Sequence, residues 1–147
     1  YIMEPLFIAS SFLFGREVMS QTVTNSTRTI LGGVSSILED EDFLFKKILM
    51  DYDLVSKVKI IDSYINEIMC VDNDLTKQAI KLCIQGISEI LIKIDKEVQT
   101  IKEKIKEHTE LWFHRFRTPE YKGLLINLEN DIRILSERFD LLIKIKN

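Results

Sequence analysis

The stretch from Leu75 to Trp112 constrains the fold most, because its apolar residues recur at alternating steps of three and four. An α-helix places such positions along one stripe, and the strict alternation is typical of the seam of a coiled-coil-like helix. The stripe comprises Ile80, Ile84, Ile87, Leu91, Ile94, Val98, Ile101 and Ile105, followed by His108 and Trp112. At ~1.5 Å of rise per residue the helix would be roughly 57 Å long. A helix of that length cannot bury its stripe alone, so other parts of the chain should cover it.

The composition favours an all-α fold. The 147-residue chain contains two Pro and five Gly, too few for the many turns of an all-β fold, whereas Leu, Ile, Lys and Glu dominate. With 46% apolar and 29% charged residues, it has the composition of an ordinary globular protein. Its length fits one domain, residues 1–147. The net charge of −3 disfavours nucleic acid as a partner.

Two further segments show the same periodicity, residues 54–70 and residues 119–146. Thr118 and Pro119 are suited to the N-cap and the first position of the last helix. Short links make consecutive helices antiparallel neighbours. We therefore predict an antiparallel helical bundle of about four helices. It is built around a long coiled-coil-like α-hairpin of residues 75–113 and 119–146, with residues 54–70 laid against that hairpin.

Residues 39–53 are predicted to form an acidic linker and a short helix. The four acidic residues from Glu39 to Asp42 place negative charge where the short helix begins, which is electrostatically favourable. A calcium site is the alternative, but the spaced oxygen ligands and the turn glycine of an EF-hand are missing. The apolar residues from Phe43 to Leu49 should dock on the bundle, and Asp53 is predicted to cap the following helix.

Residues 1–38 form an apolar segment with few charges, and two interpretations of it stay open. In the first, it is a core helix that the other helices surround. In the second, it is a detachable arm whose residues 5–38 contact a membrane or a partner protein. The apolar run after Pro5 ends at Gly15, which is too short to span a bilayer. Gly32-Gly33 is expected to kink or end the helix.

The densest group of chemically versatile side chains follows the long helix, where aromatic residues alternate with basic ones. Aromatic rings beside arginine can stack on a ligand, bind phosphate or rest at a membrane interface. The alternative is a helix–helix corner in which the rings close one end of the bundle. The predicted partner-binding residues are Trp112, Phe113, Arg115, Phe116, Arg117 and Tyr121.

The sequence predicts no catalytic residue, no metal and no cofactor. The carboxylates of the long helix, among them Glu97, all fall off the seam, where paired acids for acid–base or di-metal chemistry would have to lie. His108 and His114 fall on different helix faces. Cys70 and Cys83 are expected to be free, buried thiols in a reducing compartment, with a bridge between two helices as the alternative.

Two runs carry a resemblance to known proteins, Gly86 to Ile94 and His108 to Tyr121 with its tryptophan-containing helix corner. In these runs the second half of the chain resembles uncharacterised small all-helical proteins of large double-stranded DNA viruses. The resemblance implies an intracellular viral protein and is compatible with a place in the virus particle. It carries no activity and no functional residue over to this chain.

The functional prediction is a non-enzymatic helical scaffold or protein–protein interaction module, such as a viral structural or virion-associated protein. Its partner would be another protein or a second copy of the chain. The alternative is a membrane-associating helical bundle that acts through its apolar N-terminal helix. We expect the protein in a cytoplasmic, reducing compartment. The interaction hypothesis allows a place in the virion, and the alternative hypothesis places the protein at a membrane.

Overall fold

The computed structural model describes residues 15–39, 43–70, 77–110 and 122–147. Within these ranges the chain forms helices and no strand, which confirms the all-α class for the described residues. The helices are α2 (Gly15–Glu39), α3 (Phe43–Tyr52), α4 (Leu54–Cys70), α5 (Gln78–Glu110) and α6 (Lys122–Lys146).

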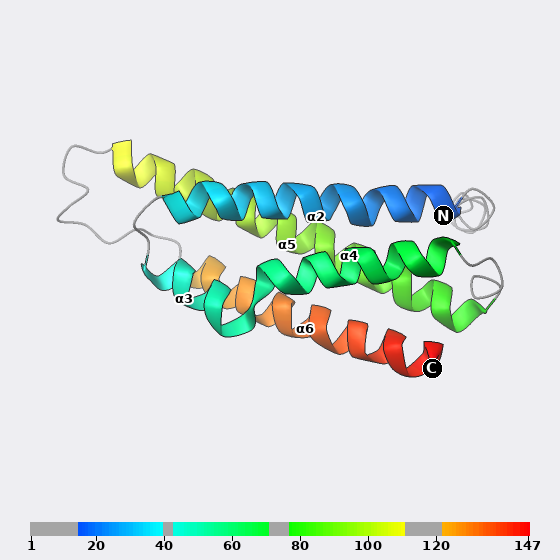
Figure 1. Ribbon diagram of the computed structural model, residues 1–147. Helices are drawn as coiled ribbons and strands as arrows, with labels where there is room; N and C mark the ends of the chain where they lie inside the picture. The colour runs from blue at the N-terminus through cyan, green and yellow to red at the C-terminus, as the bar shows by residue number, and fades with distance from the viewer. Residues whose placement is uncertain (1–14, 40–42, 71–76, 111–121) are drawn as a thin grey trace, which may run out of the picture.

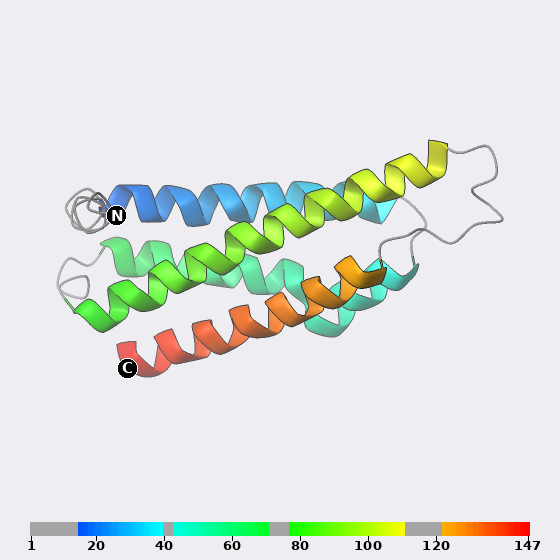
Figure 2. The same cartoon turned by 180° about the vertical axis from the view of Figure 1, so that it is seen from behind.

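The longer helices α2, α4, α5 and α6 lie side by side along roughly one direction (Figure 1). α2 and α5 run one way and α4 and α6 run the other way, so each long helix is antiparallel to the next one along the chain. Seen from behind, α5 runs obliquely between α2 and α6 (Figure 2). α5 contacts both of these helices, α2 also contacts α4, and α3 contacts α4 and α6.

α5 supplies the middle of the hydrophobic core. Its eight predicted seam residues from Ile80 to Ile105 are all buried. They pack with an apolar face of each neighbouring helix, represented by Ile30 of α2, Ile61 of α4 and Leu128 of α6, which are all fully buried. Each fully buried aliphatic side chain stabilises the fold by about 1.5–3 kcal/mol relative to an exposed one. One continuous apolar core therefore joins all five described helices.

α2 contributes to this core from Val23 to Ile37. Val23, Ile30, Val34 and Ile37 recur at helical spacing and are buried. The helix continues through the glycine pair to Glu39, so the prediction that it could end at Gly32-Gly33 is wrong. A Cβ atom built on Gly33 would lie 2.7 Å from Cγ1 of Val98, because the α2 backbone approaches α5 closely there.

Asp53 alone joins α3 to α4, and its backbone lies in the left-handed region with a φ of 48°. Asp53 directly precedes α4, and its carbonyl oxygen accepts the Lys57 N–H at 3.0 Å, as expected of the predicted N-cap residue. Its left-handed backbone differs from the extended one that N-cap residues usually have. Aspartate adopts the left-handed region more readily than most residues other than glycine. The sharp corner brings Phe45 and Leu49 of α3 into the core, where both are buried.

From the sequence, the two cysteines are expected to be free and buried. The two cysteines are free, but Cys70 at the end of α4 is exposed rather than buried, and Cys83 is half-buried. Burial raises the pKa of the Cys83 thiol.

In the described part of the chain, no helix combines the length and the apolar character that crossing a bilayer requires.

Candidate functional site

The predicted partner-binding corner falls in residues 111–121, which lie outside the described residues. This applies to each of its members, Trp112, Phe113, Arg115, Phe116, Arg117 and Tyr121. The described chain resumes at Lys122, the first residue of α6.

A groove of about 490 Å³ lies between α3 and α6. Its lining residues are Lys47, Ile48, Asp51, Tyr52, Lys122, Leu125, Ile126 and Glu129. Leu125 is buried and Ile48 is half-buried, whereas Ile126 keeps 61% of its surface exposed. The groove therefore offers apolar area to a partner at a surface formed by two helices that are distant in the sequence.

Polar groups of both signs surround this apolar area. The Tyr52 hydroxyl donates a hydrogen bond of 2.5 Å to Oε1 of Glu129, which joins α3 to α6 across the groove. Lys47 and Lys122 are exposed, and neither ammonium group has an ion-pair partner among the described residues. Asp51 also lines the groove. Two unpaired cations beside an apolar surface can receive carboxylates from a partner.

A second polar cluster lies between α2 and α4. The Ser20 hydroxyl donates to Oδ1 of Asn66 at 2.5 Å, and the Thr24 hydroxyl donates to Oδ1 of Asp62 at 2.9 Å. The Asn66 amide donates to the same Asp62 oxygen at 3.1 Å. These part-buried hydrogen bonds fix the register of α2 against α4, because a shift of one helical turn would leave the polar side chains without partners.

The third cluster lies at the contact between α5 and α6. Asp131 of α6 is almost completely buried at 1% exposure, and Nζ of Lys93 lies 3.3 Å from its Oδ1 atom. Glu97 lies one helical turn after Lys93 on α5, and its Oε2 atom is buried. The expectation that paired acids would be missing from this interface is therefore wrong, since Glu97 faces Asp131 closely enough for the two carboxyl groups to interact.

The environment of this pair favours a protonated carboxyl group. Burial, the side-chain hydrogen bond that a protonated Glu97 makes with Asp131, and the negative charge of Asp131 together raise the pKa of Glu97 to about 8. The positive charge of Lys93 acts in the opposite direction. Lys93 cannot neutralise the pair fully, because 62% of its side chain is exposed and water screens its charge.

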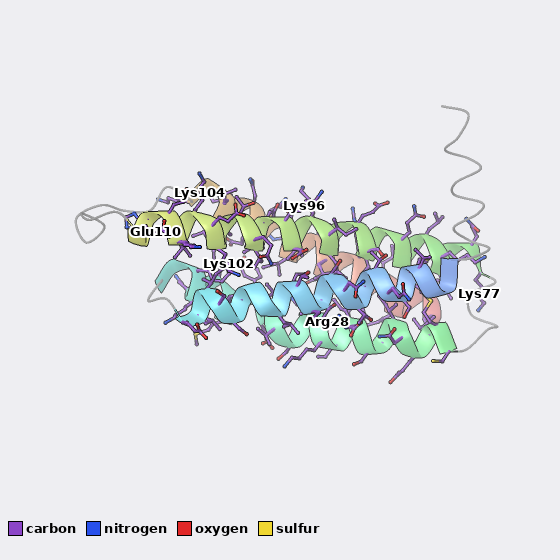
Figure 3. The ribbon with its side chains drawn as sticks, turned by 90° about the horizontal axis from the view of Figure 1, so that it is seen from above. Arg28, Lys77, Lys96, Lys102, Lys104 and Glu110 are labelled. Atoms are coloured by element: carbon purple, nitrogen blue, oxygen red, sulfur yellow. The ribbon has the colours of Figure 1, made fainter. Side chains whose placement is uncertain are left out.

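Most other charged side chains of α5 are exposed to solvent. Lys96, Lys102 and Lys104 are all exposed, and Figure 3 shows Lys96 and Lys104 on one edge of α5 and Lys102 on the opposite edge. Lys104 pairs with the exposed Glu107 at 3.8 Å, an (i, i+3) pair that contributes little to stability in water. Across the described ranges, no cluster of three or more His, Cys, Asp or Glu residues forms a metal-binding group.

The spacing of apolar residues around Asp131 and Glu97 indicates this acidic pair in the sequence. Asp131 follows Leu128 by three residues and precedes Leu135 by four, so it occupies a position of the apolar stripe of α6. Glu97 is placed in the same way between Ile94 and Ile101 on α5. An acidic residue at a step of three or four from apolar neighbours on both sides indicates a carboxyl group at the edge of a helix interface.

One curated relative shows what this chain is similar to. An uncharacterised protein of Acanthamoeba polyphaga mimivirus is 34% identical over 116 residues, which is 79% of this chain and 54% of the viral protein. The match therefore extends beyond the second half of the chain and supports the resemblance to uncharacterised proteins of large DNA viruses. The chain spans about half the length of this relative. No protein-family model and no solved structure matches the chain significantly.

Proposed function

We propose that this chain is a non-enzymatic helical interaction module, which holds an acidic amphipathic helix of a partner protein in the groove between α3 and α6. The single observation that carries this proposal is the combination, in one groove, of an exposed Ile126 with two lysines that have no ion-pair partner among the described residues.

The apolar part of the groove supplies the driving force for binding. An amphipathic helix presents apolar side chains at steps of three and four and can lay them into a groove between two helices. Fully burying an isoleucine is worth about 1.5–3 kcal/mol. Because Ile126 is 61% exposed in the free chain, its burial against a partner would contribute roughly 1–2 kcal/mol.

The charges select the kind of helix. Lys47 and Lys122 would meet carboxylates at the borders of the partner's apolar stripe, which adds electrostatic complementarity and accelerates encounter. Asp51 and Glu129 place negative charge in the same groove, so the carboxylates of such a helix would have to lie beside Lys47 and Lys122. A partner with lysines at the same positions would leave Lys47 and Lys122 facing like charges.

The architecture suits a scaffold. We include in the proposal that α2, α4, α5 and α6 form a four-helix bundle whose α5–α6 hairpin packs like a coiled coil. Its support is the burial of the whole α5 stripe against its neighbours. The similarity to a mimivirus protein supports a viral setting, and the free cysteines fit a reducing compartment. The proposal therefore includes a structural or virion-associated role.

The membrane alternative stays a prediction. Membrane contact through residues 5–38 would require α2 to leave the core, although Val23, Ile30, Val34 and Ile37 are buried there. Withdrawing four buried aliphatic side chains would expose them and their partners on α5, at a cost of about 1.5–3 kcal/mol for each side chain. The groove needs no such rearrangement to bind a helix.

The proposal can be tested with a synthetic helical peptide that carries leucines at helical spacing and glutamates beside them. Binding is measured by fluorescence anisotropy, and the binding site is mapped by amide chemical shifts on the full chain. We expect the shifts to fall on α3 and α6, and we expect Ile126→Glu to weaken binding about tenfold or more. Ile60→Glu is the matched control, because Ile60 is 58% exposed on α4 and does not line the groove.

Several outcomes would contradict the proposal. The peptide could fail to bind, or Ile60→Glu could weaken binding as much as Ile126→Glu does. A peptide with lysines in place of the glutamates could bind equally well, which would remove the role of Lys47 and Lys122. Self-association that Ile126→Glu abolishes would assign the groove to a second copy of the chain. Flotation of the full chain with anionic vesicles, without peptide binding, would favour the membrane alternative.

A further inference from the structure

The acidic pair between α5 and α6 has two oxygen atoms without a donor. Oε2 of Glu97 and Oδ2 of Asp131 are both buried, and neither has a hydrogen-bond partner among the described residues. Buried polar atoms in native proteins are almost always hydrogen-bonded, because an unpaired one loses its hydration without compensation. Each of the two facing carboxyl groups therefore has one oxygen that lacks a hydrogen-bond donor, and a single cause could account for both.

A proton provides that explanation. Two ionised carboxylates are both acceptors, so they repel each other and cannot form a hydrogen bond. When one of them is protonated, its O–H group donates to an oxygen of the other, and both unmet oxygens acquire a partner. The ion pair between Lys93 and Oδ1 of Asp131 indicates that Asp131 keeps the negative charge and Glu97 takes the proton.

We propose that Glu97 and Asp131 share one proton at neutral pH, and that this proton locks α5 to α6 and releases the contact when the pH rises. In the locked state, Glu97 donates to Asp131 and Asp131 is paired with Lys93. Loss of the proton leaves two facing carboxylates against one ammonium group, most of which is exposed to water.

The surroundings contain little else that could take over the role of the proton. On α6, the nearby Glu129 accepts from Tyr52, and Arg138 donates to the Gly86 carbonyl oxygen at 2.5 Å. From α4, Lys57 donates to the Ser136 hydroxyl oxygen at 2.7 Å.

The helix on the other side of α5 offers no substitute either. In the part of α2 where side-chain exposure is described, the charged residues are Arg28 and Glu39, and both are exposed. At its closest approach to this part of α5, α2 presents the Gly33 backbone to Val98 and Gln99. Among the described residues, the charged groups that act on Glu97 are thus Asp131 and Lys93.

The direction of the pH effect follows from linkage. The pKa of Glu97 is raised in the folded state from its ordinary value of 4.5 to about 8. Folding therefore favours the protonated form, and the stabilisation is complete below the unfolded pKa and is lost as the pH rises through the folded one. Between these two values the unfolded state binds one proton fewer, so the unfolding equilibrium constant should rise about tenfold for each pH unit.

The experiment compares the pH dependence of urea unfolding for the natural chain and for Glu97→Gln. The glutamine amide can donate to Asp131 at every pH and so imitates the protonated acid. We expect the unfolding constant of the natural chain to rise about tenfold per pH unit, relative to the variant, between about pH 5 and about pH 8. Glu103→Gln removes an exposed carboxylate of the same helix and should leave the natural dependence unchanged.

If Glu97→Gln does not fold, a direct titration of the Glu97 carboxyl group in the natural chain tests the proposal. In the natural chain, the side-chain carboxyl carbon of Glu97 should titrate in the NMR spectrum with a midpoint near 8, and amide shifts around Glu97 and Asp131 should change with it. A midpoint near the ordinary 4.5 would overturn the proposal. Parallel unfolding curves for the natural chain and Glu97→Gln across the range would overturn it as well.

Discussion

The neighbouring glycines of α2 allow a matched test of how α2 packs on α5. A Cβ atom on Gly32 would meet nothing within 4 Å. A Cβ atom on Gly33 would lie 2.7 Å from Cγ1 of Val98 and 2.8 Å from Nε2 of Gln99. The two substitutions to alanine therefore make the same chemical change in the same helix, and only one of them meets a neighbouring helix.

The magnitudes follow from two opposing effects. Alanine is favoured over glycine in a helix interior by about 1 kcal/mol, so Gly32→Ala should stabilise the chain by up to that amount. The same gain applies to Gly33→Ala, but it is opposed by overpacking of about 1–3 kcal/mol. Val98 cannot easily move aside, because it is fully buried and β-branched. Gln99 donates to the Thr29 carbonyl oxygen at 3.1 Å, a bond that it would have to break.

We expect Gly33→Ala to be less stable than Gly32→Ala by about 1–3 kcal/mol. Urea unfolding followed by circular dichroism measures this difference, provided that the slope of the transition is the same for both variants. If both substitutions stabilise the chain equally, α2 does not approach α5 at Gly33 and this part of the packing is wrong.

Three further predictions concern single positions. Ile94 is fully buried in the seam, so Ile94→Ala should lower the free energy of unfolding by about 2–5 kcal/mol, and Ile94→Asp should abolish the cooperative transition; an unchanged melting curve for Ile94→Asp would mean that the seam is misplaced. Thr27 is buried and its hydroxyl lacks a partner among the described residues, so Thr27→Val should be neutral or stabilising by about 1 kcal/mol in thermal unfolding, and a clear loss would reveal a partner. Asp53 has a left-handed backbone, so Asp53→Gly should raise the unfolding free energy by about 0.5–1 kcal/mol, whereas a decrease would show that its side chain stabilises the corner.

The core could be predicted from the sequence because helical spacing alone determines which side chains share a face. The eight stripe residues of α5 are buried, and so are Leu54, Val58, Ile61, Ile65 and Ile68 of α4. The resemblance to viral proteins was also visible, and the comparison extends it beyond the second half of the chain. Periodicity carries this information because burial of an amphipathic helix depends on its own sequence more than on its partner's.

Features that depend on two helices at once could not be predicted in the same way. The pair of Glu97 and Asp131 requires the register of α5 against α6, and the α3–α6 groove joins residues 47–52 to residues 122–129. α2 approaches α5 closely at Gly33 because this residue has no side chain. From the sequence alone, a glycine in a helix indicates a site where the helix is weakened. The predicted partner-binding corner of residues 111–121 lies outside the described residues, and its role stays a prediction.

We infer that α2 belongs to one cooperative core with α4, α5 and α6, so that the protein acts through its outer surface. Hydrogen exchange measured across residues 15–39 of the full chain tests this most directly. We predict that the central amides of α2 exchange as slowly as those of α5, through global unfolding. Fast exchange in α2 beside slow exchange in α5 would contradict the claim and would identify α2 as an arm that leaves the core.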